Sequence, residues 1–177
     1  MKKVIVTGLL VLFCFLFQTS VCHWFAFGGI IPNLMVILVA SCGFMRGETA
    51  GMITGFCGGL LLDIFAAYGG ATGNGDMIGF FALLYLLCGY LNGKLEQLLY
   101  PEDIMFPLLV IAVSDLAINF SCYIAMFLFR ARLDIRYYFL HIMLPEAVYT
   151  IVVAFVLYPV FLWINRKLEK TDRGSIE

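Results

Sequence analysis

Long apolar stretches separated by short polar segments dominate the chain. Each stretch is close to, or longer than, the roughly 20 residues that a helix needs to cross a bilayer. The six stretches cover residues 4–21, 25–45, 49–67, 77–95, 104–129 and 137–163. Only Arg46, Gly47 and Glu48 separate the second from the third, which predicts a tight helical hairpin. The pattern therefore predicts an all-α polytopic membrane bundle of about six transmembrane helices.

Composition supports the membrane interpretation. Hydrophobic residues make up 63% of the chain and charged residues 13%, which is about half the charged fraction of a typical soluble domain. A soluble surface could not be covered by so few polar groups, whereas lipid removes that requirement. Six spans leave little of the 177 residues for loops, so we expect one integral membrane domain over residues 1–177. The net charge of −1 offers no basic field for nucleic acid.

The distribution of lysine and arginine predicts the orientation, because cytoplasmic loops carry an excess of both. With both termini in the cytoplasm, eight basic residues lie inside and three outside. The outer three are Arg130, Arg132 and Arg136. We also expect the first apolar stretch to remain as a span, because Val21 stands where a lipoprotein cleavage site requires a small residue.

A row of small residues runs along the third stretch. Gly47, Gly51, Gly55 and Gly59 recur every four residues, and Asp63 continues the row. Residues four apart form one ridge of a helix, and a ridge without side chains lets another backbone approach closely. The row predicts helix packing, either inside this bundle or against a partner's span. Asp63 is expected to form an ion pair with the outer arginines or to cap a helix end, and a substrate or ion site is the alternative.

Two acids are predicted at membrane depth. Asp115 lies near the middle of the fifth stretch, where a charge costs about 2.5–3.5 kcal/mol on insertion scales and requires a partner. Asn119 is one helical turn away, and Glu146 of the sixth stretch has a comparable depth. With Tyr149, these residues form a predicted buried polar network. It could fix the orientation of the helices, or it could be a proton or ligand site.

Sequence motifs for catalysis or metal binding are absent. The two histidines are too few for a histidine metal site, and none of the six cysteines forms a C-x-x-C pair. No nucleophile–base motif is found either. We therefore expect no enzyme activity, no metal and no cofactor.

The order of short motifs resembles that of MreD, the bacterial rod shape-determining membrane protein family. The resemblance covers residues from about 15 to 165. The motifs are Gln18-Thr19-Ser20, Pro32-Asn33-Leu34, Arg46-Gly47, Gly55-Phe56 with Gly59, Leu61-Leu62-Asp63, Tyr85, Gly89-Tyr90-x-x-Gly93, and Leu144-Pro145 with Tyr149. Thr150 and Glu146 depart from the family pattern, in which asparagine and serine are common at these positions.

The resemblance implies a fold and a function that residue spacing cannot show. It implies a fold similar to the substrate-binding S-components of energy-coupling-factor transporters, in the bacterial cytoplasmic membrane. It also implies a non-enzymatic scaffold of the wall-elongation machinery. The implied partners are an MreC-like single-span protein, through it the actin-like MreB, and the glycan polymerase RodA with its penicillin-binding transpeptidase. A substrate-binding subunit of a vitamin or metal transporter is the alternative, and a small intramembrane enzyme ranks third.

Overall fold

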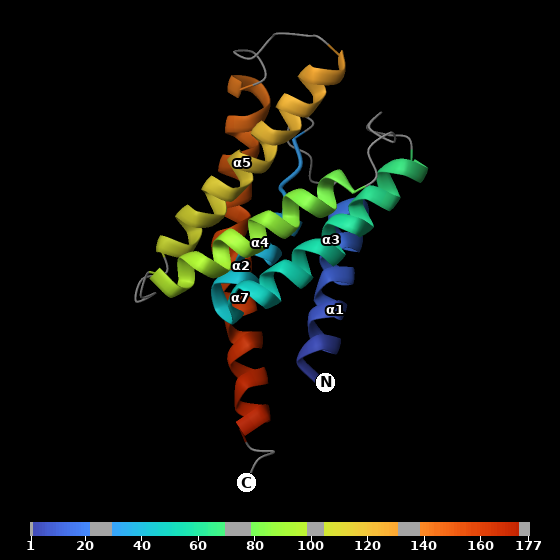
Figure 1. The fold of residues 1–177 in the computed structure, drawn as a ribbon. Coiled ribbons are helices and arrows are strands. Elements are labelled where there is room, and N and C mark those ends of the chain that lie inside the picture. Colours follow the sequence, from blue (N-terminus) through green and yellow to red (C-terminus); the bar gives the residue numbers. More distant parts are fainter. Residues whose placement is uncertain (1, 22–29, 70–78, 99–104, 131–138, 174–177) are drawn as a thin grey trace.

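The computed structural model describes residues 2–21, 30–69, 79–98, 105–130 and 139–173. Its described elements are helical, and they form a membrane-type bundle (Figure 1). In chain order they are α1 (Lys2–Leu16), the π-helical turn η1 (Phe17–Val21), α2 (Leu34–Arg46), α3 (Glu48–Gly69), α4 (Phe80–Leu98), α5 (Met105–Arg130), the π-helical turn η2 (Phe139–Met143) and α7 (Leu144–Arg173). Each of the six predicted apolar stretches overlaps one of the six described α-helices, and α7 continues ten residues past the predicted end at residue 163.

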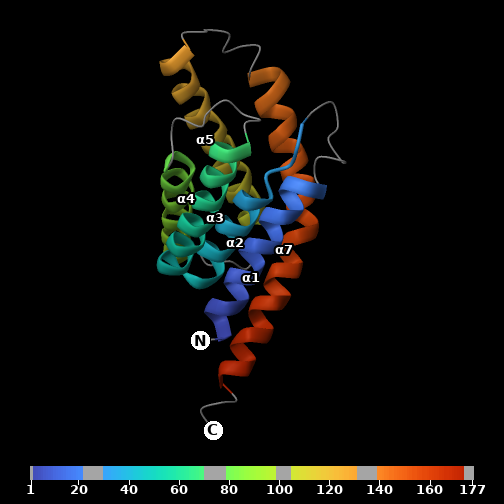
Figure 2. The same ribbon diagram turned by 90° about the vertical axis from the view of Figure 1, so that its right-hand side faces the viewer.

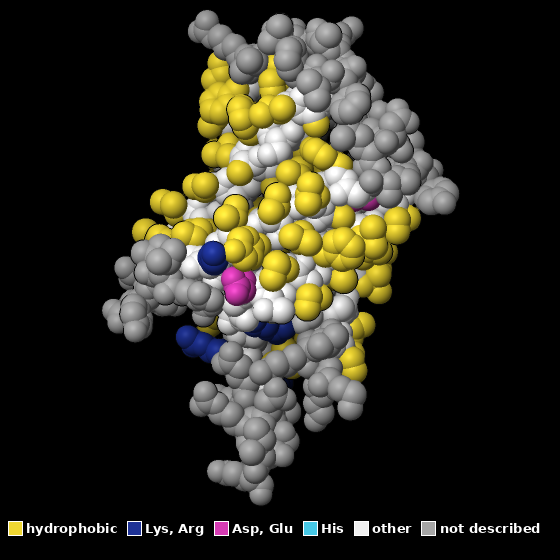
Figure 3. Space-filling view, in the orientation of Figure 1, with side chains coloured by type: hydrophobic (Ala, Val, Ile, Leu, Met, Phe, Trp, Pro, Cys, Tyr) yellow, Lys and Arg dark blue, Asp and Glu magenta, His cyan; other side chains and the backbone are white. Residues whose placement is uncertain are grey.

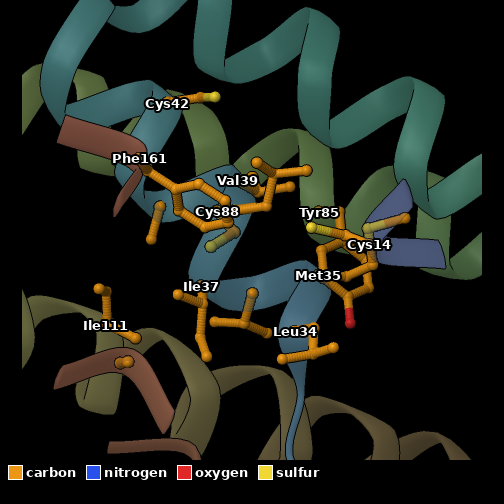
Figure 4. Packing of buried hydrophobic residues seen from close by; sticks show 14 of the residues in the cluster. Cys14, Leu34, Met35, Ile37, Val39, Cys42, Tyr85, Cys88, Ile111 and Phe161 are labelled. Carbon is orange, nitrogen blue, oxygen red and sulfur yellow. The ribbon is translucent and has the colours of Figure 1, made fainter. Parts of the chain in front are cut away.

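The short helix α2 forms the centre of the bundle. Each of its residues from Leu34 to Phe44 is buried, and the helix contacts α1, α3, α4, α5 and α7. Figure 4 shows side chains of α2 packed among residues of the surrounding helices. Its 13 residues span about 20 Å at 1.5 Å per residue, which is less than the roughly 30 Å of a bilayer's hydrocarbon core.

The start of α2 corrects the sequence-based boundary. Hydropathy placed the beginning of the second helix at residue 25, whereas α2 begins at Leu34. Pro32 disfavours helical backbone at the residue before it, and the side chain of Asn33 caps α2 by accepting a hydrogen bond from the Val36 amide at 3.3 Å. Residues 22–29 lie outside the described part of the chain.

Three segments are long and apolar enough to cross a membrane by themselves: Glu48–Phe65, Met105–Ala125 and Phe139–Leu168. Three shorter apolar segments, Ile5–Ser20, Leu34–Arg46 and Phe80–Leu95, complete the bundle. The outer faces of the longest helices are strongly hydrophobic: Val152, Phe155 and Trp163 of α7 are about three-fifths exposed. In Figure 3 hydrophobic side chains cover most of the described surface, and the Lys and Arg side chains gather toward one end. This surface is suited to lipid, as expected for a membrane bundle.

The start of α1 and the end of α7 lie at the same end of the bundle (Figures 1 and 2). Among the described helices, α3 and α4 make the most extensive contact. Figure 2 shows α3, α4 and α2 side by side, with α1 and α7 beyond them. From Gly51 onward, the predicted glycine row and Asp63 belong to α3, which packs against α4. The predicted polar network belongs to α5 and α7, both of which contact the central helix α2.

Candidate functional site

Glycines of α3 lie directly against the backbone of α4. A Cβ added at Gly51 would meet the carbonyl of Gly89, and one added at Gly55 would meet the carbonyl of Tyr85. One added at Gly59 would meet the backbone of Phe81 and Ala82. In each case the approach is closer than van der Waals contact permits. The two backbones can touch only because these positions lack side chains.

The α4 side of this contact is built in the same way. A Cβ at Gly89 would meet the Gly51 backbone, and one at Gly93 would meet the backbone of Glu48 and Gly47. Gly43 of α2 also faces the Gly89 carbonyl, at 2.8 Å from its added Cβ. We call Gly51, Gly55, Gly59, Gly89 and Gly93 the glycine seam. Because α4 covers the glycine-bearing face of α3, a helix of another protein cannot pack against that face.

Gly47 has a different position from the other glycines of the row. It is the residue between α2 and α3, and its N–H donates to the Gly43 carbonyl at 2.9 Å. Its φ of 84° lies in the left-handed region, which glycine adopts without strain. Gly47 therefore makes the hairpin turn, and the predicted ridge begins at Gly51.

Asp63 caps the N-terminus of α4. Its Oδ1 accepts a hydrogen bond from the Phe81 amide at 3.0 Å, and its Oδ2 accepts one from the Ala82 amide at 2.9 Å. The residue is only 3% exposed, so these two donors replace water around the carboxylate. A negative group also interacts favourably with the positive end of the helix dipole. Two of the three arginines suggested as partners, Arg132 and Arg136, lie outside the described residues.

Polar side chains from distant parts of the chain meet at the N-terminus of α2. The Asn33 Oδ1 accepts from the Tyr85 hydroxyl at 2.9 Å, and the Asn33 N–H donates to the Thr150 Oγ1 at 3.2 Å. The Gln18 Oε1 accepts from the Met35 amide at 3.0 Å. The first amides of a helix have no partner within it, and here η1 and the Asn33 cap supply two of the acceptors. This junction ties α1, α4 and α7 to α2.

The predicted network only partly coincides with this junction. Asp115 is fully buried on α5, and the Thr150 and Asn33 side chains lie beside its carboxyl group. The Asn119 amide donates to the backbone carbonyl of Asp115 at 3.2 Å. Glu146, in the first turn of α7, lies near the Asp115 carboxyl and beside Asn119. Among these α7 residues, Tyr149 instead lines a groove between α1 and α7.

A second polar link lies at the other end of α2. The Arg46 guanidinium donates from Nε to the Asn165 Oδ1 at 2.6 Å and from a terminal nitrogen to the Thr7 Oγ1 at 2.5 Å. Arg46 is in the last turn of α2, where a cation interacts favourably with the negative end of the helix dipole. The two ends of α2 are thus fixed by polar side chains, and its middle is fixed by apolar packing.

Two grooves are open on the outside of the bundle. One, of about 440 Å³, lies between α4 and α5. Its wall includes Leu91, Val113, Asn92 and Ser114, and the last two bond each other, with Asn92 Nδ2 3.0 Å from Ser114 Oγ. The other, of about 500 Å³, lies between α1 and α7 and is lined almost wholly by apolar side chains. Among the described residues no three His, Cys, Asp or Glu side chains are grouped to hold a metal ion.

A comparison with protein-family models decides the family. The model described as rod shape-determining protein MreD matches residues 1–168. The chain belongs to the MreD family. No curated protein and no solved structure matches it.

MreD membership makes this chain a rod shape-determining membrane protein. The transporter alternative gains no support from the comparisons. Several of the motif residues on which the resemblance rested form specific contacts in this MreD chain. Gln18, Asn33 and Tyr85 meet at one end of α2, and Arg46 forms the link at the other end.

Reasoning from spacing missed most of the polar contacts of α2. Asn33 and Tyr85 entered only as family motifs, and Thr150 only as a departure from the MreD pattern. Arg46 was also expected in the hairpin turn, but without its partners. Thr150 is completely buried, and 117 positions separate it from its partner Asn33. Spacing along one helix cannot reveal such a pair. The available signal was weaker: a polar residue in an otherwise apolar stretch requires a hydrogen-bond partner inside the bundle.

Proposed function

We propose that this chain is a non-enzymatic scaffold subunit of the wall-elongation machinery. In this proposal it crosses the bacterial cytoplasmic membrane six times, with both termini in the cytoplasm. It binds an MreC-like single-span protein, through which it is linked to the actin-like MreB. It also lies beside RodA and the penicillin-binding transpeptidase. The MreD family match over residues 1–168 is the observation that carries the proposal.

The topology has support of two kinds. The start of α1 and the end of α7 lie at the same end of the bundle (Figure 1), as an even number of crossings requires. The excess of lysine and arginine on the side that holds both termini favours the cytoplasm for that side. In this orientation the Arg46 link lies near the cytoplasmic surface, and the Asp63 cap lies toward the outer surface.

The architecture is also consistent with a scaffold. The glycine seam and the polar links of α2 join the helices at fixed positions. The groove between α4 and α5 is the better binding surface for the single-span partner. Its wall carries the Asn92–Ser114 pair, of which Asn92 is buried and only Ser114 is partly exposed. A helix lying in the groove would cover the Ser114 hydroxyl and the exposed side chains of Leu91 and Val113. The groove between α1 and α7 is apolar and suits lipid chains.

Depletion of the protein in its own rod-shaped host tests the proposed function. Cells lacking it are expected to become round, because side-wall synthesis loses its scaffold. A plasmid-borne wild-type copy should restore rods, and cell width and length measured by microscopy are the readout. Cells that keep their rod shape and normal growth after complete depletion would contradict the proposal.

A further inference from the structure

Asp115 is a buried acid whose charge has no visible partner. It is the eleventh of the 26 residues of α5, about 15 Å from the helix start at 1.5 Å per residue. Its relative exposure is 0%, and neither carboxyl oxygen has a hydrogen-bond partner among the described residues. A polar group in such a position normally has its hydrogen bonds satisfied. A positive or donating group placed beside these oxygens would satisfy them.

Polar side chains of two other elements lie near this carboxyl group. Glu146 and Thr150 approach from α7, and Asn33 approaches from the N-terminus of α2. The Thr150 hydroxyl accepts from the Asn33 N–H, so its own hydrogen can be donated elsewhere. The Asn33 Oδ1 already accepts from Val36 and Tyr85, which leaves its amide nitrogen to face the carboxyl. Polar side chains therefore lie near Asp115 inside a bundle whose core is otherwise mostly apolar.

The charges in this region do not balance. If both acids are ionised, Asp115 and Glu146 contribute two negative charges, whereas the N-terminus of α2 contributes only about half a positive charge. Tyr85 and Cys88 of α4 lie within electrostatic range of Asp115, and Cys122 of α5 lies within that range of Glu146. All three of these side chains are ordinarily uncharged. Arg46 lies at the opposite end of α2. With both carboxyl groups ionised, the region would carry a net charge of about −1.5, and one small cation would reduce it to about −0.5.

We propose that Asp115 and Glu146 together hold one small cation between α5 and α7. The cation is a proton or an alkali metal ion such as Na⁺, either of which supplies one positive charge in a small volume. The two carboxyl groups and the Thr150 hydroxyl are its ligands. Asn33 is a positioning residue on one side, and Asn119, which lies beside Glu146, is one on the other. The site does not depend on the proposed scaffold function.

Infrared spectroscopy of the full chain in lipid nanodiscs tests the proton. A neutral carboxylic acid gives a C=O stretching band that an ionised carboxylate lacks. At neutral pH and without sodium, we expect such a band in the wild type. Labelling aspartate with ¹³C at the carboxyl carbon, or replacing Asp115 by asparagine, should move or remove it if Asp115 holds the proton. If the band survives both changes and disappears in Glu146→Gln, the proton resides on Glu146.

Thermal unfolding in the same nanodiscs tests the metal ion. Replacing choline chloride by NaCl at constant ionic strength should raise the unfolding midpoint if Na⁺ binds, and Asp115→Asn should abolish that rise. Glu48→Gln is the matched control, since Glu48 lies in the first turn of α3, outside this cluster. It should leave both the band and the sodium response unchanged.

The two measurements decide between the proposal and its alternative. A carboxylic acid band assigned to either acid supports the proposal with a proton. A sodium response that requires Asp115 supports it with a metal ion. Wild-type protein that shows neither a band nor a sodium response would have both acids ionised without a cation, and the proposal would be wrong. The wild type alone shows whether any neutral carboxylic acid is present, even if the Asp115 variant does not fold. Because the label marks every aspartate, Asp63→Asn serves as the control that separates Asp115 from the other buried aspartate among the described residues.

Discussion

Individual glycines in this chain have very different surroundings, although the sequence presents them alike. Gly8 of α1 has open space where a Cβ would lie, whereas Gly55 of α3 has the Tyr85 carbonyl in that place. In a helix, alanine is favoured over glycine by about 1 kcal/mol when nothing obstructs it. When the position is already filled, overpacking costs about 1–3 kcal/mol. The same substitution therefore has opposite effects at the two sites.

Gly55→Ala is expected to lower the thermal unfolding midpoint of the detergent-solubilised protein, because its methyl group forces α3 and α4 apart. Gly8→Ala, the matched control, should leave the midpoint unchanged or raise it slightly. Gly55→Leu should have a larger effect than Gly55→Ala and reduce the yield of folded protein. Equal midpoints for Gly55→Ala and Gly8→Ala would show that the seam does not hold the two helices in contact.

Single polar residues also determine where α2 begins. Asn33→Ala removes the cap of α2, which typically costs about 0.5–2 kcal/mol. It also leaves the Tyr85 hydroxyl, in a side chain only 2% exposed, without its acceptor, at a further cost of about 1–3 kcal/mol. The second cost depends on the hydroxyl being present.

A double-mutant cycle therefore separates the two costs. Asn33→Ala combined with Tyr85→Phe should be less destabilised than the sum of the single variants, because the phenyl ring has no hydroxyl to leave unpaired. Chemical denaturation in mixed micelles, followed by circular dichroism, supplies the four unfolding free energies. Additive effects within about 0.5 kcal/mol would mean that the Asn33–Tyr85 hydrogen bond contributes nothing measurable.

Among the helices, the long apolar ones were the easiest to predict. Runs of hydrophobic residues placed α3 and α5 to within two residues and α4 to within three, because lipid requires continuous apolar segments whatever the tertiary contacts. They missed the polar end of α7, which continues to Arg173 instead of ending at residue 163. The spacing of Gly51, Gly55 and Gly59 also indicated a face for close packing. It could not name α4 as the opposing helix, because Gly89 and Gly93 are only two further glycines in an apolar run.

The central helix was the hardest to predict. Hydropathy treats residues 25–45 as one stretch, since Pro32 and Asn33 hardly lower the average over such a window. The helix begins after them for local reasons, namely the conformational restriction before proline and the cap supplied by asparagine. Its surroundings depend on tertiary structure: Gln18, Tyr85 and Thr150 come from three different segments. No property of residues 34–46 alone predicts that the other five helices surround them.

At the level of the whole bundle, the fixed interior contrasts with the open grooves at its surface. Positions Leu91 and Val113, each 57% exposed, line the groove between α4 and α5. Ile53 of α3 has a similar exposure of 59% and does not line that groove. These three residues therefore allow the groove to be compared with another apolar surface of the same protein.

A photoreactive amino acid at Leu91 or Val113 is expected to crosslink to the single-span partner in native membranes, because a helix in the groove would contact both positions. The same probe at Ile53 should yield only lipid adducts or other proteins. Crosslinked products are identified by immunoblotting for the partner and by mass spectrometry. If Ile53 crosslinks to that partner as strongly as Leu91 and Val113 do, the groove is not the binding surface.

The glycine seam also has a mechanical meaning. Where side chains separate two helices, rotamer changes can absorb small displacements, but touching backbones leave nothing flexible between them. The α3 and α4 helices should therefore move together as one rigid unit in the membrane. Any pull that a neighbouring protein applied to α4 would reach α3 undiminished, and through Gly43 and the Tyr85–Asn33 hydrogen bond it would reach the core helix. A protein that helps set the shape of a cell against turgor would be well served by a part that transmits force without yielding.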